Sequence, residues 1–225
     1  MRFCVTLLVL SAVPQLALAN PTVTDTKQRP STMLWEKVTV HVGTKVSQVD
    51  GVYRFRLRRD DHPSESRDHV TVWLPVLMPG GDYQQYEKRY GTPVVKLAGR
   101  QFPVHTWHDI SRDDQPEYHF LPPKRFREMS FGSYYCDIPL RLLKSEYELQ
   151  ISYRQPHAVG DVVGYIPFRP PGNHGTSRII FQADRGLLVR KPAWWAPFTK
   201  AQQSLEFVPE PDRLIEVQVV SHGKP

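Results

Sequence analysis

The side chains best suited to contact a ligand lie between two prolines near the end of the chain. Residues 191–198 read Lys-Pro-Ala-Trp-Trp-Ala-Pro-Phe. Successive strand residues point to opposite faces, and proline does not fit a central strand, so the two indoles do not enter one sheet face together. Exposed aromatic rings stack on sugars or anchor protein interfaces. We therefore predict a binding region that comprises Trp194, Trp195, Phe198, Tyr165 and His174. The alternative is that the indoles close one end of a buried core.

A second segment whose side chains could bind a metal is 105–109, His-Thr-Trp-His-Asp. His119 follows it in the sequence. Imidazole and carboxylate groups are zinc ligands. On a strand, however, His105 and His108 face opposite sides, and the chain has no H-E-x-x-H or clustered Cys/His pattern. These residues are predicted to be surface histidines, and we predict no metal site.

Signatures of covalent or phosphate chemistry are absent from the sequence. There is no G-x-S-x-G elbow and no glycine-rich phosphate loop. The pairs at 60–61 and 113–114 are adjacent aspartates in expected loops, where such carboxylates usually stay solvated. We predict no catalytic residue and no cofactor. A secreted hydrolase with a loop-borne carboxylate or a site at His105, His108 and Asp109 stays as the alternative.

The first 19 residues have the pattern of a signal peptide. An apolar run follows Arg2 and ends at the A-x-A sequence of residues 17–19. Ser11 and Pro14 interrupt the run, which is shorter than the roughly 20 apolar residues that span a bilayer. The pattern predicts cleavage after residue 19, export to a periplasmic or extracellular location, and a soluble product with no transmembrane span.

The two cysteines exclude a disulfide-rich scaffold. Cys4 would leave with the signal peptide, so Cys136 would stand alone in the mature chain. It lies in the aromatic, strand-like segment 134–139, where a buried and unreactive thiol is expected.

The chain is moderately basic, with a formal net charge of +6. Such a balance favours anionic partners, including lipid headgroups, acidic glycans and acidic proteins. The densest basic cluster is Arg54, Arg56, Arg58 and Arg59. Because these arginines mostly alternate with Phe55 and Leu57, the pattern indicates a strand with one solvated face, and no nucleic-acid partner is predicted.

Most of the mature chain has the alternation of β-strands. Val38, Val40 and Val42 alternate with polar residues, as do 52–58 and 147–153. The dipeptide Asp50-Gly51 is interpreted as a turn before the second of these runs. A hairpin is expected around 98–101, with its second strand at 102–107.

These short strands and 21 prolines predict an all-β, antiparallel β-sandwich, Ig-like in the broad sense. One short helix is expected near 82–90, with Asp82 as N-cap and Gly91 after its last turn. Its three tyrosines, at 83, 86 and 90, share one helix face. They are predicted to pack against a sheet, with stacking on a sugar as the alternative.

The predicted organisation is a signal peptide at 1–19, an extended or disordered lead-in at 20–34 and a sandwich domain at 35–221. The long proline-rich loop at 109–127 leaves a subdivision of that domain open.

Two segments, 134–139 and 151–156, resemble those that flank the domain junction of pilus-assembly chaperones, a family with two Ig-like domains. The resemblance covers a few dozen residues at most. Because Trp35 to Val42 contains no arginine, the basic anchor motif of that family is missing, and neither membership nor any site residue follows.

Taken together, the sequence predicts an exported, non-catalytic binding module whose partner is a glycan or an envelope protein. The alternatives are the hydrolase above and a periplasmic, chaperone-like assembly factor.

Overall fold

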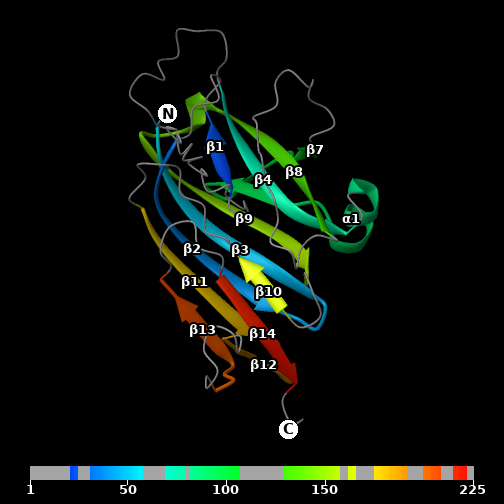
Figure 1. The fold of residues 1–225 in the computed structure, drawn as a ribbon. Helices are drawn as coiled ribbons and strands as arrows, with labels where there is room; N and C mark the ends of the chain where they lie inside the picture. Colours follow the sequence, from blue (N-terminus) through cyan, green and yellow to red (C-terminus); the bar gives the residue numbers. More distant parts are fainter. Residues whose placement is uncertain are drawn as a thin grey trace, which may run out of the picture.

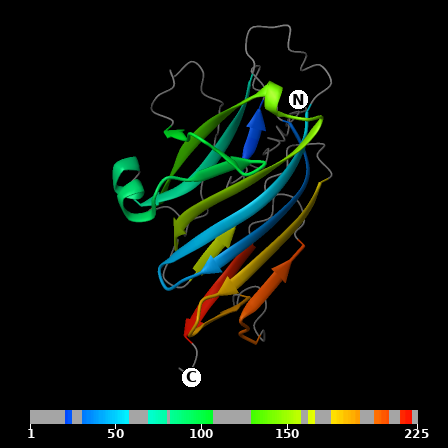
Figure 2. The ribbon, with the colours of Figure 1, turned by 180° about the vertical axis from the view of Figure 1, so that it is seen from behind.

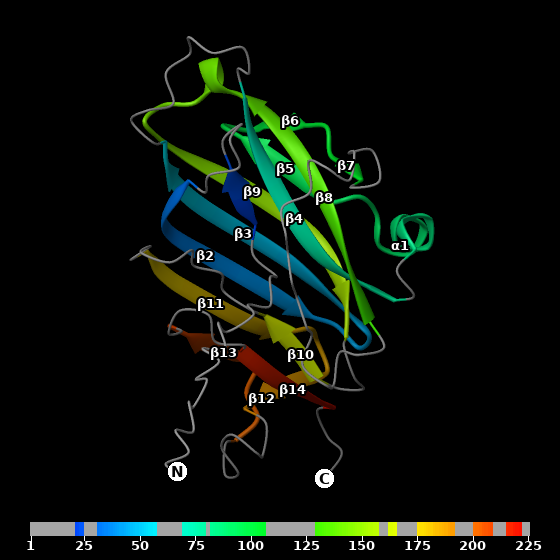
Figure 3. The ribbon, with the colours of Figure 1, turned by 45° about the horizontal axis from the view of Figure 1, so that its top comes forward.

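The chain forms two layers of β-strands (Figures 1 and 3). The computed structural model describes residues 21–24, 31–57, 69–79, 82–106, 129–157, 162–165, 175–191, 200–208 and 215–221. One layer is a seven-stranded sheet, and two smaller sheets lie side by side on one of its faces. The predicted all-β sandwich is therefore confirmed.

The large sheet has the strand order β13-β11-β2-β3-β9-β5-β6. Its strands are β13 (Ser204–Phe207), β11 (Thr176–Ala183), β2 (Thr32–Val42), β3 (Val46–Arg56), β9 (Glu146–Pro156), β5 (Val94–Leu97) and β6 (Arg100–Phe102). The pairing is antiparallel except between β11 and β2, which are parallel. The chain enters β11 from the other layer and not through a hairpin from β2, so no tight turn imposes an antiparallel direction.

The covering layer has a four-stranded and a three-stranded sheet. The first is β1 (Thr22–Thr24), β4 (His69–Pro79), β8 (Met129–Pro139) and β7 (His105–Thr106), in that order. The second is β10 (Val162–Tyr165), β14 (Ile215–Ser221) and β12 (Leu187–Arg190). Strand β1 and the start of β2 fall within the predicted lead-in at 20–34, and these two segments are extended and paired.

The core lies between the two layers and follows the predicted alternation. Val38, Val40 and Val42 are fully buried, whereas the residues between them are not. One continuous cluster of buried apolar side chains includes residues of all three sheets. Burial of such a surface is the main stabilising contribution to a fold of this kind.

The prediction of a turn at Asp50-Gly51 is wrong, because both residues lie inside β3 and pair with β2 and β9. The glycine is needed for packing. A Cβ atom at Gly51 would lie 2.3 Å from Cε2 of the Tyr53 ring, which folds back over this position. The bend between β2 and β3 instead spans residues 43–45, where the amide of Gly43 donates to the carbonyl of Val46.

The predicted strand at 102–107 is split in two. Its first part, β6, ends at Phe102 in the large sheet, whereas β7 pairs with β8 in the covering layer. Pro103 stands at the break, and a proline has no backbone N–H to continue a ladder.

The β5–β6 hairpin turns through Ala98 and Gly99, both with positive φ (48° and 80°). This is the two-residue turn that favours Asn-Gly. We expect Ala98→Asn to raise the free energy of unfolding by about 0.5–1 kcal/mol, because asparagine tolerates the left-handed region better than alanine. Urea unfolding checks this result, and an Ala98→Val variant, expected to be less stable than wild type, is the control.

The helix α1 (Tyr83–Tyr90) confirms the predicted helix and its cap. Asp82 accepts hydrogen bonds from the amides of Gln84 and Gln85, and Gly91 follows with φ 79°. A 3₁₀ turn, η4 (Leu140–Leu142), links β8 to β9. Within the described parts of the chain, neither helical segment has the length and apolar character to cross a membrane.

The tyrosines of α1 pack against the sheets, as predicted. The Tyr83 hydroxyl donates to the carbonyl of Ser133 (3.0 Å) and accepts from the amide of the same residue (2.9 Å). The buried Tyr86 donates its hydroxyl to the carbonyl of Arg154 in β9. These bonds fix the helix to β8 of the covering layer and to β9 of the large sheet.

Candidate functional site

The candidate site is the face of the seven-stranded sheet that points away from the two smaller sheets, which we call the open face (Figure 2). No other described strand or helix lies across it. In β2, β3 and β9, every second side chain is buried in the core, and the alternate ones are exposed or half-buried. The alternation that builds the core therefore also builds this polar surface.

Strand register brings the side chains of the open face into two adjacent rows. The first row crosses β2, β3, β9 and β5 and contains Lys37, Val52, Gln150 and Lys96. The second crosses the same strands and contains Thr39, Asp50, Ser152 and Val94. Together the two rows line a shallow groove of about 420 Å³.

Hydrogen bonds hold the centre of the groove. The Ser152 hydroxyl donates to Asp50, and Nε2 of Gln48 lies 2.9 Å from the Ser152 oxygen and 3.4 Å from Oδ1 of Asp50. Nε2 of His41 lies 3.7 Å from Oδ2 of Asp50. The serine is thus bonded to the carboxylate and not to the imidazole, which differs from the serine–histidine pair of a catalytic triad. This arrangement suits recognition of hydrogen-bonding groups.

A second pocket adjoins the groove at the end near α1, and we call it the α1 pocket. It has a volume of about 310 Å³. Its lining residues are His41, Val46, Gln48, Arg89, Tyr90, Arg154 and Asp184. The two hollows are neighbours on the sheet, because His41 and Gln48 are the next outward positions after Thr39 and Asp50 on β2 and β3.

The predicted basic strand face is confirmed for Arg54 and Arg56, at the other end of the open face, where their charges are compensated. Arg58 and Arg59 lie outside the described residues. Arg56 donates to Oε1 of Glu146 from Nε (3.1 Å) and Nη2 (2.8 Å), and Arg54 lies 3.0 Å from Oε2. These arginines, Arg56 foremost, lower the pKa of Glu146. Lys96 in the groove has no ion pair within the described residues. The ammonium group of Lys96 is therefore available to an anionic ligand, whereas Arg54 and Arg56 are already paired with Glu146.

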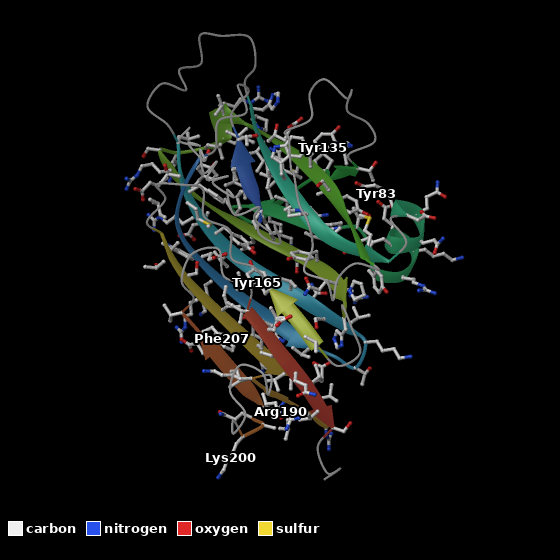
Figure 4. The ribbon with its side chains drawn as sticks, viewed as in Figure 1. Tyr83, Tyr135, Tyr165, Arg190, Lys200 and Phe207 are labelled. Carbon is white, nitrogen blue, oxygen red and sulfur yellow. The ribbon has the colours of Figure 1, made fainter. Side chains whose placement is uncertain are left out.

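Four of the predicted binding residues, Trp194, Trp195, Phe198 and His174, lie outside the described residues and stay predictions. The fifth, Tyr165, lies in β10 and is fully buried (Figure 4). Its hydroxyl lies 3.1 Å from that of Tyr53, and both belong to the space between the layers. A fully buried side chain presents no surface to an outside ligand, so Tyr165 acts in the core.

Sequence reasoning missed a buried carboxylate next to Tyr165. Glu36 is only 2% exposed, and the Ser177 hydroxyl donates to it. The Tyr165 hydroxyl also lies 3.5 Å from Oε2 of Glu36. The sequence did contain a signal for this burial. Glu36 lies two residues before the buried Val38 in β2 and therefore points to the same face of the sheet. Such a polar group inside a core is hydrogen-bonded, and this one joins the two layers.

Most of the predicted histidine segment lies outside the described residues. His105 is exposed in β7, with its ring centroid 5.3 Å from that of Tyr135. His108, Asp109, His119 and the aspartate pairs at 60–61 and 113–114 lie outside the described residues. Where the structure describes the chain, no three His, Cys, Asp or Glu side chains gather as metal ligands do.

Cys136 is fully buried in β8. Burial raises the pKa of its thiol to about 12, and the neighbouring Asp137 carboxylate adds to the shift. Because the thiolate is the reactive form, we expect iodoacetamide at pH 8 to leave the folded protein unlabelled and to label it fully in guanidinium chloride. Mass spectrometry of a chain that begins at residue 20, and so lacks Cys4, measures this. Rapid labelling of the folded protein would contradict the buried position.

Comparisons with known proteins assign this chain to no family. No protein-family model matches the sequence, and no curated protein matches it either. Among solved structures, the fold is similar to native leukotriene A4 hydrolase from Saccharomyces cerevisiae, with a TM-score of 0.43 and 10% identity. That similarity covers 88% of this chain and 29% of that one.

An aminopeptidase N family protein from Idiomarina loihiensis has a TM-score of 0.37 and 9% identity, over 82% of this chain and 29% of that one. This chain spans less than a third of either protein. Similarities at these TM-scores do not establish a function.

Proposed function

We propose that the protein is an exported, non-catalytic binding module whose open-face groove binds an acidic polysaccharide. One observation carries this proposal. Strand register aligns Lys37, Gln150 and Lys96 beside Thr39, Asp50 and Ser152, along a single groove on a sheet face that no described strand or helix covers. Ammonium, amide, hydroxyl and carboxylate groups at one surface match a ligand rich in hydroxyl groups that also carries negative charge.

The composition of the groove favours a glycan over a protein partner. Protein interfaces are centred on buried aromatic residues and arginines. The described lining of the groove has no aromatic side chain. Its apolar residues are Val52, Val94 and Ile151, of which Ile151 is buried. The positive charge of Lys37 and Lys96 exceeds the single negative charge of Asp50, so a negatively charged polymer is preferred to a neutral one.

The sheet edges bear on the alternative of a chaperone-like role by strand addition. An incoming strand needs a long unpaired edge. The outermost strands here are β13 and β6, β1 and β7, and β10 and β12, each of which has two to four residues. The strands next to them are longer. Among the described residues, β7 pairs with only two residues of β8 and β1 with only three of β4, so both β8 and β4 keep unpaired edge positions and strand addition stays the alternative to the open face.

The test is isothermal titration calorimetry of the mature protein with oligogalacturonate, a polymer of uronic acids. Lys37→Ala/Lys96→Ala is expected to weaken binding about tenfold, equivalent to about 1.4 kcal/mol, because two charge-assisted contacts are lost. The control is Arg141→Ala/Lys144→Ala, which removes the same charge from two exposed residues at the β8–β9 link.

The control variant should bind like wild type at 150 mM salt, where distant charges are screened. Equal losses in both double variants would show a nonspecific charge effect and reject the groove. An absence of oligogalacturonate binding by wild type would reject the proposed ligand.

A further inference from the structure

We propose that the α1 pocket is a subsite for a single uronic-acid residue, with its carboxylate between Arg154 and Arg89 and its ring against Tyr90. This inference rests on the proposed function, because it identifies the part of the acidic polysaccharide that the open face recognises most specifically. The groove beside it would hold the remaining sugars of the chain.

Arg154 is the best oriented cation of the pocket. Its Nε lies 3.3 Å from Oε1 of Gln48, within hydrogen-bond distance, and its backbone carbonyl accepts the hydroxyl of Tyr86. The side chain is exposed and has no ion pair among the described residues. With Nε held by Gln48, the two terminal NH₂ groups stay available for the planar, two-point contact that guanidinium makes with a carboxylate.

The other two groups come from the last turn of α1. Arg89 is exposed, and Tyr90 is half-buried with its ring centroid 5.1 Å from that of Tyr86. Because Tyr86 is buried and bonded to β9, it fixes the helix end that carries both residues. A partly exposed aromatic face next to a cation is suited to an acidic sugar, whose C–H groups pack on the ring while its carboxylate meets the guanidinium.

The acidic residue of the pocket limits which anions fit. Asp184 lines the same hollow as the two arginines, and Asp50 lies in the adjoining groove. Each carboxylate accepts hydrogen bonds from sugar hydroxyls and repels a densely charged chain. A ligand with one carboxylate per sugar satisfies both conditions, whereas a polyphosphate satisfies neither.

The test follows the Arg154 Nε–H signal by NMR in ¹⁵N-arginine-labelled protein during titration with D-glucuronate. Glucuronate is expected to shift this signal in a saturable manner, and D-glucose at the same concentrations is not. Arg154→Lys keeps the charge and loses the two-point geometry, so glucuronate affinity, measured then on backbone amides of β9, should fall about fivefold or more. Arg141→Lys at the β8–β9 link, outside both hollows, is the matched control and should leave glucuronate affinity unchanged.

Tyr90 supplies a second, independent variant. Tyr90→Phe should keep glucuronate binding, and Tyr90→Ala should weaken it, because the aromatic face is present only in the first. An unshifted Arg154 signal, or an Arg154→Lys affinity equal to that of wild type, would overturn the subsite. Inorganic sulfate that binds as tightly as glucuronate would also overturn it, since the pocket would then hold any anion.

The outcome separates the subsite from the proposed function. Glucuronate binding in the α1 pocket without oligogalacturonate binding in the groove would retain the subsite and reject the polysaccharide module. Oligogalacturonate binding that depends on Lys37 and Lys96, with no glucuronate response at Arg154, would retain the module and reject the subsite.

Discussion

Replacing Tyr165 with alanine is expected to lower the free energy of unfolding by about 3–5 kcal/mol, the range for removal of a large buried aromatic side chain. The ring is fully buried in the covering layer. Its hydroxyl lies 3.1 Å from that of Tyr53 and 3.5 Å from the Glu36 carboxylate across the core. The substitution therefore leaves a cavity and also removes the bond between the layers. Urea unfolding followed by circular dichroism measures the loss.

Tyr165→Phe is the matched variant, since it keeps the ring and removes only the hydroxyl. We expect a loss of about 1–2 kcal/mol, because one buried hydrogen bond of Tyr53 disappears. Wild-type stability in both variants, together with lost ligand binding, would place Tyr165 at the surface and contradict the packing described here.

Alkaline pH is expected to destabilise the protein steeply from about pH 10 upward. Burial raises the pKa of Tyr53, Tyr153 and Tyr165 above the ordinary value, and the Glu36 carboxylate adds to each shift. Below pH 10 these tyrosines are protonated in both states, so their contribution is constant. Above pH 10 the unfolded chain loses these protons and the folded chain retains them. Stability then falls by up to about 1.4 kcal/mol per pH unit for each tyrosine, or about 4 kcal/mol for three.

The measurement is urea unfolding at pH 8, 9.5, 10.5 and 11. Absorbance at 295 nm reports tyrosinate, and the signal of the buried tyrosines should appear only as the chain unfolds. Tyr165→Phe should reduce the slope of stability against pH by one proton. Unchanged stability between pH 9.5 and 11 would contradict raised pKa values in the folded state.

Local patterns in the sequence were enough to predict the sandwich and its helix. The period-2 pattern of Val38, Val40 and Val42 predicted a buried strand face, and Asp82 with Gly91 predicted the ends of α1. These features depend on neighbours within a few residues, where propensity and phase are informative.

Features set by packing across the fold were not predictable in the same way. Asp50-Gly51 has the composition of a turn, yet the Tyr53 ring needs the space above the glycine inside a continuous strand. Glu36 is buried although its residue type is usually exposed, because Ser177 and Tyr165 approach it from other strands. The alternation of β2 places Glu36 on the inward face, but the identity of its partners on other strands has no local signal in the sequence.

The candidate site depends on register more than on any motif. Lys37 and Lys96 are far apart in the sequence, and each alone looks like an ordinary solvated position. Pairing of β2 with β3, β3 with β9 and β9 with β5 brings them into one row. A one-residue shift of register in any of these pairs would point side chains of this row toward the core. The groove therefore follows from the same alternation that stabilises the sheet.

The most direct test of the open face as the ligand surface is to map backbone amide shifts of the mature protein on titration with oligogalacturonate. We predict that the shifted amides lie in β2, β3, β9 and β5, with Lys37, Asp50 and Gln150 among them, and continue into the last turn of α1. Shifts confined to residues 192–199, with these strands unaffected, would contradict the open face and return the binding site to the tryptophan segment.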